Sequence, residues 1–191
     1  MKALEEKILR EGEILPGNIV KVGRFLNQQI DVAFLMEMGR EIARLFQNEG
    51  VTRVLTVEAS GIPLAVAAAA ALNVPMVFAK KHQSANLTGD LYSAEVFSFT
   101  HKKTYTIMMS RDYLSASDRV LIVDDFLALG NAVGGLIQII DEAGASLAGV
   151  SAAIEKGFQG GGDALRAKDI RVESLAIIDA MDDTTITYRP Q

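Results

Sequence analysis

Apolar positions in the first part of the chain alternate between the spacing of a helix and that of a strand. From Asp31 to Asn48 they follow helical spacing, which predicts an amphipathic helix capped by Asp31. Arg53–Val57 and Pro75–Ala79 are short, largely apolar runs that predict buried strands, with a helix over Ile62–Leu72 between them. A strand, a helix and a strand in this order form a βαβ unit, which requires a parallel sheet.

Two smaller elements are predicted before this unit. Residues 2–11 have the spacing of a short amphipathic helix, with Leu4, Ile8 and Leu9 on its buried side. Ile19–Leu26 alternates loosely and predicts a strand.

The helical spacing breaks between Lys80 and Asp118. Two alternating runs, Leu91–Phe99 and Thr104–Met109, are flanked by polar turns and predict a β-hairpin inside a long excursion. Excursions of this length in compact domains commonly carry function, often as lids over a site.

The alternation of strands and helices resumes after the excursion. The expected elements are a strand over 119–124, a helix over 131–143, a strand over Leu147–Ile154, a Gly-rich turn at Gly160–Gly162, a short helix over 163–168, and strands over Arg171–Ile178 and Thr185–Tyr188. The whole pattern shows no repeat or linker. It predicts an α/β fold in a single domain over residues 1–191, with a doubly wound, mostly parallel sheet.

Composition and charge narrow the class of protein. The chain has 191 residues, of which 49% are hydrophobic and 23% charged, as in an ordinary globular domain. The net charge of −5 gives no general attraction to nucleic acid or to an anionic membrane, although it leaves room for a local anion site. The absence of cysteine excludes disulfides and a thiolate nucleophile, and with two histidines we expect no histidine-rich metal site.

The sequence predicts neither a signal peptide nor a membrane span. The charged N-terminus lacks the apolar core of a signal peptide. The most apolar run, Gly61–Val77, is interrupted by Pro63, Asn73 and Pro75. We therefore expect a cytoplasmic protein.

The stretch Val120–Ala132 combines three features of a ligand site. A buried strand ends in Asp124 and Asp125, and a loop with Gly130 then opens onto a helix. The amide groups at a helix N-terminus can hold a phosphate, and the carboxylates can accept hydrogen bonds from a sugar diol. A ribose 5-phosphate carries both groups. The alternative is that the acids merely end a strand and Gly130 starts a helix.

Two further segments suggest anion binding. Ser60 and Gly61 offer backbone amides at the start of the helix from Ile62, although they also suit a simple helix cap. Lys80-Lys81-His82, where the excursion begins, would meet phosphate oxygens when the excursion closes; the alternative is a solvated corner.

A fourth segment, from Ile154 to Phe158, suits a flat ring that carries oxygen atoms. Lys156 can donate to such oxygens and Phe158 can stack on the ring. The alternative is an exposed ion pair between Glu155 and Lys156, with Phe158 as ordinary core.

These segments resemble the type I phosphoribosyltransferases, whose binding motif is similar to Val120–Ala132. The resemblance covers almost the whole chain, and it is greatest to the bacterial members that act on xanthine. Beside the central motif it rests on K-A-L-E-E-K-I, V-x-R-F-L-N-Q-Q-I-D, E-A-S-G-I-P-L-A-V, F-A-K-K-H, Y-S-A-E-V-F-S-F-T and I-E-K-G-F-Q.

The resemblance implies an enzyme of purine salvage. It would transfer the 5-phosphoribosyl group from phosphoribosyl pyrophosphate to xanthine, giving xanthosine 5'-monophosphate and pyrophosphate. It implies a small N-terminal hood over about residues 1–30, a flexible loop over about 80–118, a homodimer, and Mg²⁺ that is carried by the substrate with no direct metal ligand from the protein.

The resemblance also implies a role for each candidate residue. Asp124 and Asp125 would be catalytic and bind the ribose hydroxyls. The other residues that would bind phosphoribosyl pyrophosphate are Ala128, Leu129, Gly130, Asn131, Ala132, Ser60, Gly61 and Lys81. The residues that would bind the purine are Val20, Asn27, Lys156 and Phe158.

Donor and acceptor groups favour xanthine over other bases. Lys156 and Asn27 can donate to the oxygens at C2 and C6 of xanthine, whereas the amino group of adenine would leave a donor facing a donor. Guanine differs from xanthine only at C2. A guanine, hypoxanthine or adenine transferase therefore remains an alternative.

One departure from the family pattern leaves a second alternative. Many relatives have threonines in the phosphate loop, whereas Leu129–Ala132 has no hydroxyl, so the phosphate would depend on backbone amides. The alternative is a regulator that senses phosphoribosyl pyrophosphate and binds nucleic acid. Regulators of that kind carry a further DNA-binding domain and a basic face, and the acidic balance of this chain argues against one.

Overall fold

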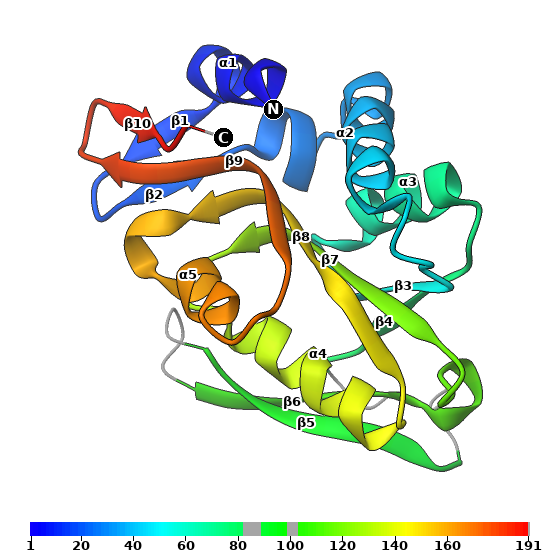
Figure 1. Ribbon diagram of the computed structural model, residues 1–191. Coiled ribbons are helices and arrows are strands. Elements are labelled where there is room, and N and C mark those ends of the chain that lie inside the picture. The colour runs from blue at the N-terminus through cyan, green and yellow to red at the C-terminus, as the bar shows by residue number, and fades with distance from the viewer. Residues whose placement is uncertain (82–88, 99–102, 191) are drawn as a thin grey trace.

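The computed structural model describes residues 1–81, 89–98 and 103–190 and contains a central six-stranded sheet (Figure 1). Its strands are, in spatial order, β10 (Ile186–Tyr188), β9 (Val172–Met181), β8 (Ser146–Lys156), β7 (Arg119–Leu127), β3 (Arg53–Val57) and β4 (Met76–Ala79). Neighbouring strands are parallel except β9 and β10, which are antiparallel. The predicted α/β fold with a mostly parallel sheet is confirmed.

The remaining elements cover this sheet. The helices are α1 (Lys2–Glu11), α2 (Val32–Phe46), α3 (Ile62–Leu72), α4 (Asn131–Glu142) and α5 (Gly161–Arg166), with single helical turns η1 (Gly23–Asn27), η2 (Arg111–Tyr113) and η3 (Gly157–Gln159). The antiparallel strand pairs are β1 (Glu13–Leu15) with β2 (Ile19–Lys21), and β5 (Leu91–Ser98) with β6 (Lys103–Ser110). Among the described residues, no helix is long and apolar enough to cross a membrane.

The order of the strands reverses between β3 and β7. From β3 the chain passes through α3 to the edge strand β4, and from β7 it passes through α4 in the other direction to β8. β3 and β7 pair directly, with Val54 opposite Leu121. In doubly wound sheets, ligands bind at the carboxyl ends of the strands where this reversal occurs. The loops that follow β3 and β7 both begin there.

Both faces of the sheet are apolar because both are covered. Leu121 of β7 belongs to the core formed with α2 and α3, and the next residue, Ile122, belongs to the core formed with α4. Figure 1 shows the N-terminal segment and the hairpin β5–β6 on opposite sides of the sheet. Gly39 allows α2 to approach α3 closely, since a Cβ there would lie 2.5 Å from the backbone carbon of Ala67.

The structure corrects two predictions in the N-terminal segment. Leu9 is 59% exposed, because α1 buries Leu4 and Ile8 together with Lys7, whose ammonium group is held by an ion pair. The predicted strand over Ile19–Leu26 is wrong beyond Lys21: a helical turn begins at Gly23 and buries two consecutive side chains, which a strand with one solvated face cannot do.

Two boundaries in the second half also differ from the prediction. The strand expected over 119–124 continues to Leu127, because β8 pairs with it along its whole length. The short helix expected over 163–168 begins at Gly161, inside the predicted Gly-rich turn. The acid pair thus lies within a strand, and the glycines open a helix.

The predicted hairpin is confirmed, with Val96 opposite Tyr105. It packs on α4, where a Cβ at Gly135 would lie 2.6 Å from the Val96 side chain. Parts of the predicted flexible loop, including His82, lie outside the described residues.

Candidate functional site

The two predicted anion turns meet at the reversal point of the sheet. Gly61, in the turn after β3, lies directly against Asp124 of β7: a Cβ on Gly61 would be 2.6 Å from Asp124 Oδ1 and 2.3 Å from Thr56 Oγ1. Any side chain at this position would displace one of them, so the close approach requires glycine. The structure therefore brings the Ser60–Gly61 turn and the acid pair, Asp124 and Asp125, into one site.

The two members of the acid pair, Asp124 and Asp125, have different environments. Asp124 is 7% exposed, and burial, followed by the charge of Asp125, raises its pKa well above the usual range. The backbone amide of Asp125 donates to Asp124 Oδ1 at 2.9 Å. Asp125 is half-buried, and its Oδ2 accepts a hydrogen bond from Asn27 Nδ2 at 3.0 Å. A carboxylate that carries an elevated pKa in a cleft is typical of a functional position.

The phosphate loop, Ala128–Ala132, ends at the N-terminus of α4. Gly130 has a φ of +82° and precedes the helix without a side-chain cap. The first helical bond runs from the amide of Gly134 to the carbonyl of Gly130 at 2.8 Å, so the amides of Asn131 and Ala132 have no acceptor within the helix. The side chain of Asn131 donates instead to the carbonyl of Phe97 in the hairpin at 2.9 Å. Free amides at a helix start suit a phosphate.

A cavity of about 260 Å³ adjoins this loop. Its lining comes from the phosphate loop, the hairpin and β7, and includes Phe97, Tyr105, Asp124, Phe126, Asn131 and Gln159. The cavity thus extends from the predicted phosphate-binding loop to Asp124, which is predicted to bind the ribose.

Lys81 lies on the same site and is held by two contacts that the sequence did not indicate. Its backbone amide donates to Glu58 Oε1 at 2.6 Å, and its ammonium group lies 5.4 Å from the centre of the Tyr105 ring. Its positive charge partly offsets the rise in the pKa of Asp124. Lys80, the neighbour on the chain, lines a different cavity, so only one of the two predicted lysines reaches the acid pair.

The predicted purine residues lie between the hood and the end of β8. Val20 belongs to one apolar cluster, and the partly buried Phe126 and Phe158 pack against it. Lys156 Nζ donates to the carbonyl of Asn18 at 3.1 Å and lies 5.9 Å from the centre of the Phe126 ring, and burial lowers the pKa of Lys156. Val20 and Asn27 also line a cavity of about 570 Å³ over the hood.

Sequence reasoning missed Phe126. The signal was available, since Phe126 follows Asp124 by two positions and strand residues at this spacing share a face. It was hidden by the expectation that the strand ends at the acid pair. The alternative of an exposed ion pair between Glu155 and Lys156 is wrong, because Glu155 is fully buried and pairs with Arg166.

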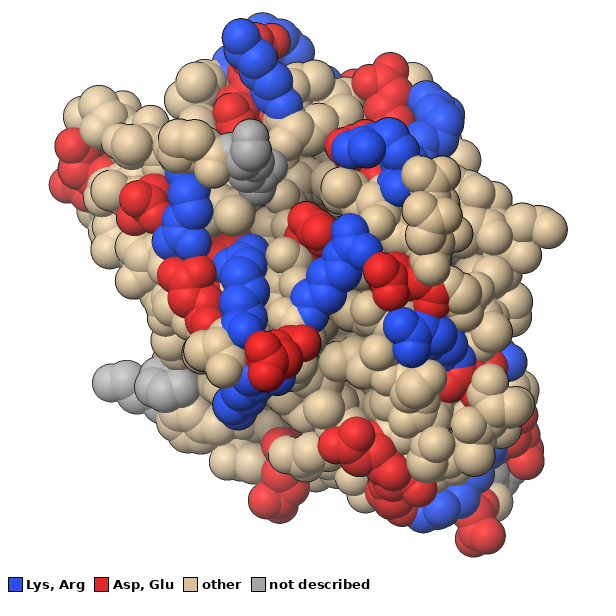
Figure 2. Space-filling view, viewed as in Figure 1, with Lys and Arg blue, Asp and Glu red and all other residues tan. Residues whose placement is uncertain are grey.

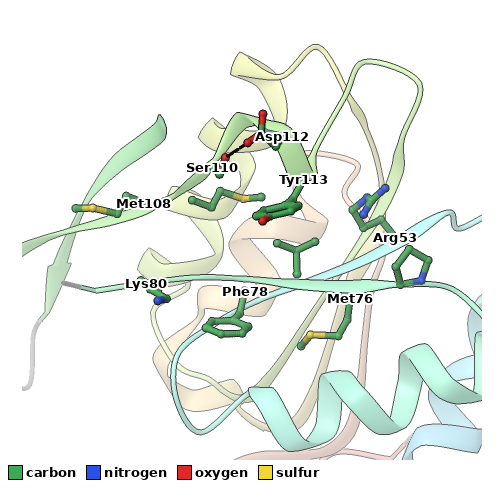
Figure 3. Close-up of a pocket in the computed structure, with 11 residues that line it drawn as sticks. Arg53, Met76, Phe78, Lys80, Met108, Ser110, Asp112 and Tyr113 are labelled. Carbon is green, nitrogen blue, oxygen red and sulfur yellow. Dashed lines mark hydrogen bonds between the residues drawn. The ribbon is translucent and has the colours of Figure 1, made fainter. Parts of the chain in front are cut away.

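A third cavity, of about 550 Å³, lies between the edge strand β4 and the end of β6 (Figure 3). Phe78, Met76 and Tyr113 give it an apolar character, and Lys80 and Arg53 lie at its margin. Of the residues predicted for the site, it contains only Lys80. Residues predicted to bind the donor, among them Asp124 and Asn131, line instead the cavity at the phosphate loop.

Among the described residues, no group of three or more His, Cys, Asp and Glu side chains is placed to hold a metal ion. The adjacent carboxylates of Asp124 and Asp125 offer oxygen atoms, the ligand type that Mg²⁺ prefers. They suit a Mg²⁺ ion that is coordinated chiefly by the oxygens of a bound substrate.

Known proteins match the chain over nearly its whole length. Residues 27–180 match the family described as "Phosphoribosyl transferase domain". The xanthine phosphoribosyltransferase of Lachnoclostridium phytofermentans is 48% identical over 99% of this chain and 98% of its own length. That of Ruminiclostridium cellulolyticum is 49% identical over 98% of this chain and 99% of its own length.

Solved structures share the fold at lower identity. The APRTase from Giardia lamblia, complexed with 9-deazaadenine, superposes with a TM-score of 0.76 at 22% identity and covers 90% of this chain and 96% of its own. The adenine phosphoribosyltransferase from Thermoanaerobacter pseudethanolicus gives 0.74 at 21% identity, covering 91% and 98%. The residues that match the family model, 27–180, include Asn27, the acid pair and the phosphate loop. The chain belongs to the phosphoribosyl transferase family.

Proposed function

We propose that the protein transfers the 5-phosphoribosyl group of phosphoribosyl pyrophosphate to xanthine, giving xanthosine 5'-monophosphate and pyrophosphate. The relatives named xanthine phosphoribosyltransferase, at 48% and 49% identity over nearly the full chain, support this base. The observation that carries the proposal is the contact of Gly61 with Asp124, because it joins two anion turns into one site with room for a donor that is phosphorylated at both ends.

In this proposal each part of the site binds one part of the donor. The 5-phosphate binds the phosphate loop through the backbone amides at the start of α4. The ribose hydroxyls donate to Asp124 and Asp125. The pyrophosphate meets the Ser60–Gly61 turn, with the charge of Lys81 nearby, and Mg²⁺ carried by the donor neutralises part of its charge.

The reaction then needs no nucleophile from the protein. As pyrophosphate leaves, positive charge develops on the ribose ring, and the negative acid pair beneath the ring stabilises that charge. The site also aligns the base with C1 and excludes water, which would otherwise hydrolyse the activated sugar. In this proposal the excursion that contains the hairpin supplies such a cover, since the carbonyl of Phe97 in β5 accepts a hydrogen bond from Asn131 of the phosphate loop.

The purine lies between the hood and β8 in this proposal. Lys156 and Asn27 donate to its oxygens, Phe158 stacks on the ring and Val20 closes the apolar side. In the structure both donors hold other partners, the carbonyl of Asn18 and the carboxylate of Asp125. Binding of the substrates therefore exchanges two internal hydrogen bonds for two to ligand.

The same proposal includes a single domain, a homodimer and a cytoplasmic location. The single domain and the location rest on the sequence pattern, and the homodimer rests on the resemblance to the family; sedimentation of the purified protein tests the dimer. The regulator alternative would need a basic surface for nucleic acid. On the face shown in Figure 2, Lys and Arg side chains lie beside Asp and Glu rather than gathering in one area, which favours the enzyme.

The decisive experiment is a turnover assay with Mg²⁺ and phosphoribosyl pyrophosphate against xanthine, guanine, hypoxanthine and adenine. We expect the highest kcat/KM for xanthine and the lowest for adenine. A preference for guanine or hypoxanthine would identify the protein as a guanine or hypoxanthine phosphoribosyltransferase instead. Binding of the donor without turnover of any base would favour the regulator.

A further inference from the structure

The Gly-rich turn and α5 have no part in the proposed function, yet Gly161 at the start of α5 contacts the backbone of the phosphate loop. The amide of Gly161 donates to the carbonyl of Ala128 at 3.1 Å. A Cβ on Gly161 would lie 2.2 Å from that oxygen, 2.5 Å from the carbonyl carbon of Leu129 and 2.8 Å from the nitrogen of Gly130. All three neighbours are backbone atoms, so no change of rotamer could relieve the contact.

This hydrogen bond fixes how the phosphate loop presents its amides. In a trans peptide the carbonyl and the following N–H point in opposite directions. Because the carbonyl of Ala128 is directed at Gly161, the amide of Leu129 is directed away from α5. The loop has no hydroxyl between Leu129 and Ala132, so the direction of its amides determines how it can hold a phosphate.

α5 is itself anchored to the sheet by an ion pair with a buried carboxylate. Arg166 donates to both carboxylate oxygens of Glu155, at 2.8 Å and 2.7 Å, and Ser174 of β9 donates to the same carboxylate at 2.6 Å. Glu155 is fully buried on β8. A Cβ on Gly162 would lie 2.0 Å from its Oε1, so α5 sits directly on the carboxylate. A paired, fully bonded charge of this kind holds its partners in one arrangement.

We propose that α5 is a brace that positions the phosphate loop, with Gly161 and Arg166 as positioning residues for the 5-phosphate of the donor. The contact with α5 fixes the direction of the loop amides. In this loop, which has no hydroxyl group between Leu129 and Ala132, that direction determines how the phosphate is held. This inference rests on the proposed function for the identity of the phosphate, and on the contacts of Gly161 and Glu155 for the mechanism.

The test uses the two fragments of the donor as separate probes. Ribose 5-phosphate and pyrophosphate with Mg²⁺ are titrated into the full chain by calorimetry, for the wild type and for Gly161→Ala. Displacing the loop should impair its hydrogen bonds to the charged phosphate and weaken the binding of ribose 5-phosphate about 10- to 100-fold, the loss expected for one such bond. The affinity for pyrophosphate should not change, and in turnover the KM of the donor should rise while that of xanthine stays constant.

A matched control and a milder variant keep the test sharp. Gly134→Ala adds the same methyl group in α4, where it would meet no atom within 4 Å, and should leave both affinities unchanged. Arg166→Lys keeps the charge but loses the two-pronged contact with Glu155, so it should give a smaller loss that is again confined to ribose 5-phosphate. It also serves if Gly161→Ala does not fold.

The outcomes separate this inference from the proposed function. Equal losses for both fragments, or no loss for ribose 5-phosphate, would overturn the brace even if xanthine is turned over. A wild type that binds neither fragment would overturn it as well. If no base is turned over but Gly161→Ala weakens only ribose 5-phosphate, the brace stands and the proposed function fails.

Discussion

The sugar-phosphate half and the purine half of the site are built in different ways. Asp124, Asp125 and the phosphate loop occupy one continuous stretch that leaves the central strand β7. The purine half depends on contacts between distant segments: Asn27 reaches Asp125 across 98 positions, and Lys156 reaches Asn18 across 138. The first half is held by the sheet and by α5, and the second by the packing of the hood. Donor binding and base selection should therefore respond to different mutations.

A buried lysine links parts of the hood to one another. Lys7 of α1 is 7% exposed, and its ammonium group pairs with Asp31 at 2.8 Å and with Glu11 at 3.2 Å. It also lies 5.4 Å from the centre of the Phe25 ring and 5.1 Å from that of Phe34. Since Phe25 belongs to the same helical turn as Asn27, this cluster links α1 to the purine half.

The largest effect is expected from the acid pair. Asp124→Asn with Asp125→Asn removes the charge beneath the ribose ring, and kcat should fall by about 10³-fold or more. Circular dichroism should show that the protein remains folded. Turnover within tenfold of the wild type, on the order of 1.4 kcal/mol, would remove the pair from the catalytic role.

Asp124→Asn alone should at the same time stabilise the free protein. Burial raises the pKa of Asp124 in the folded state, so the unfolded chain, with a value near 3.8, loses its proton first as the pH rises. The stability of the wild type therefore falls as the pH rises from 3.8 through the higher folded pKa. The variant lacks this loss, and its Tm should exceed that of the wild type more at pH 8 than at pH 4. An equal difference at both values would mean that Asp124 carries no such penalty.

The next largest effect is expected from Lys156. Lys156→Met keeps most of the side-chain volume but removes the donor, and the KM for xanthine should rise about 10- to 100-fold, in line with a hydrogen bond to a charged group. The KM of the donor should not change. Lys168→Met is the control: it makes the same substitution at an exposed position and should leave both KM values unchanged. A parallel rise in both KM values would show that the two halves are not independent.

The difference between the sugar-phosphate half and the purine half also explains which features could be predicted from the sequence. The acid pair and the phosphate loop could be proposed from the sequence because neighbours on the chain create them, whereas the contact of Gly61 with Asp124 depends on the topology of the sheet. The brace was invisible, since Gly160–Gly162 indicates only a turn until α5 is placed against Ala128. The hood was partly mispredicted at Ile19–Leu26, because tertiary burial decides whether such a short apolar run forms a strand or a helical turn.

The smallest effect tests whether the hood acts on the purine half alone. Lys7→Met removes the ammonium group at the centre of the cluster but fills the same space, so the hood should loosen rather than unfold. The KM for xanthine should rise about two- to fivefold, as for substitutions that act through packing. The KM of the donor and the affinity for ribose 5-phosphate should stay constant, because the acid pair and the phosphate loop lie on β7 and at the start of α4, outside the cluster around Lys7. Lys2→Met, at an exposed position of the same helix, is the matched control.

The pH dependence gives this last variant a second readout. Asp31 above all raises the pKa of Lys7, so the ion pair stabilises the folded state below pH 10.5 and is lost as the pH rises through the higher folded value. The wild type should therefore exceed Lys7→Met in Tm at pH 8, and the difference should shrink above pH 10.5. If the KM of the donor rises as much as that of xanthine, the hood supports the whole site. The purine half would then not be a separately held unit, whatever the Tm values show.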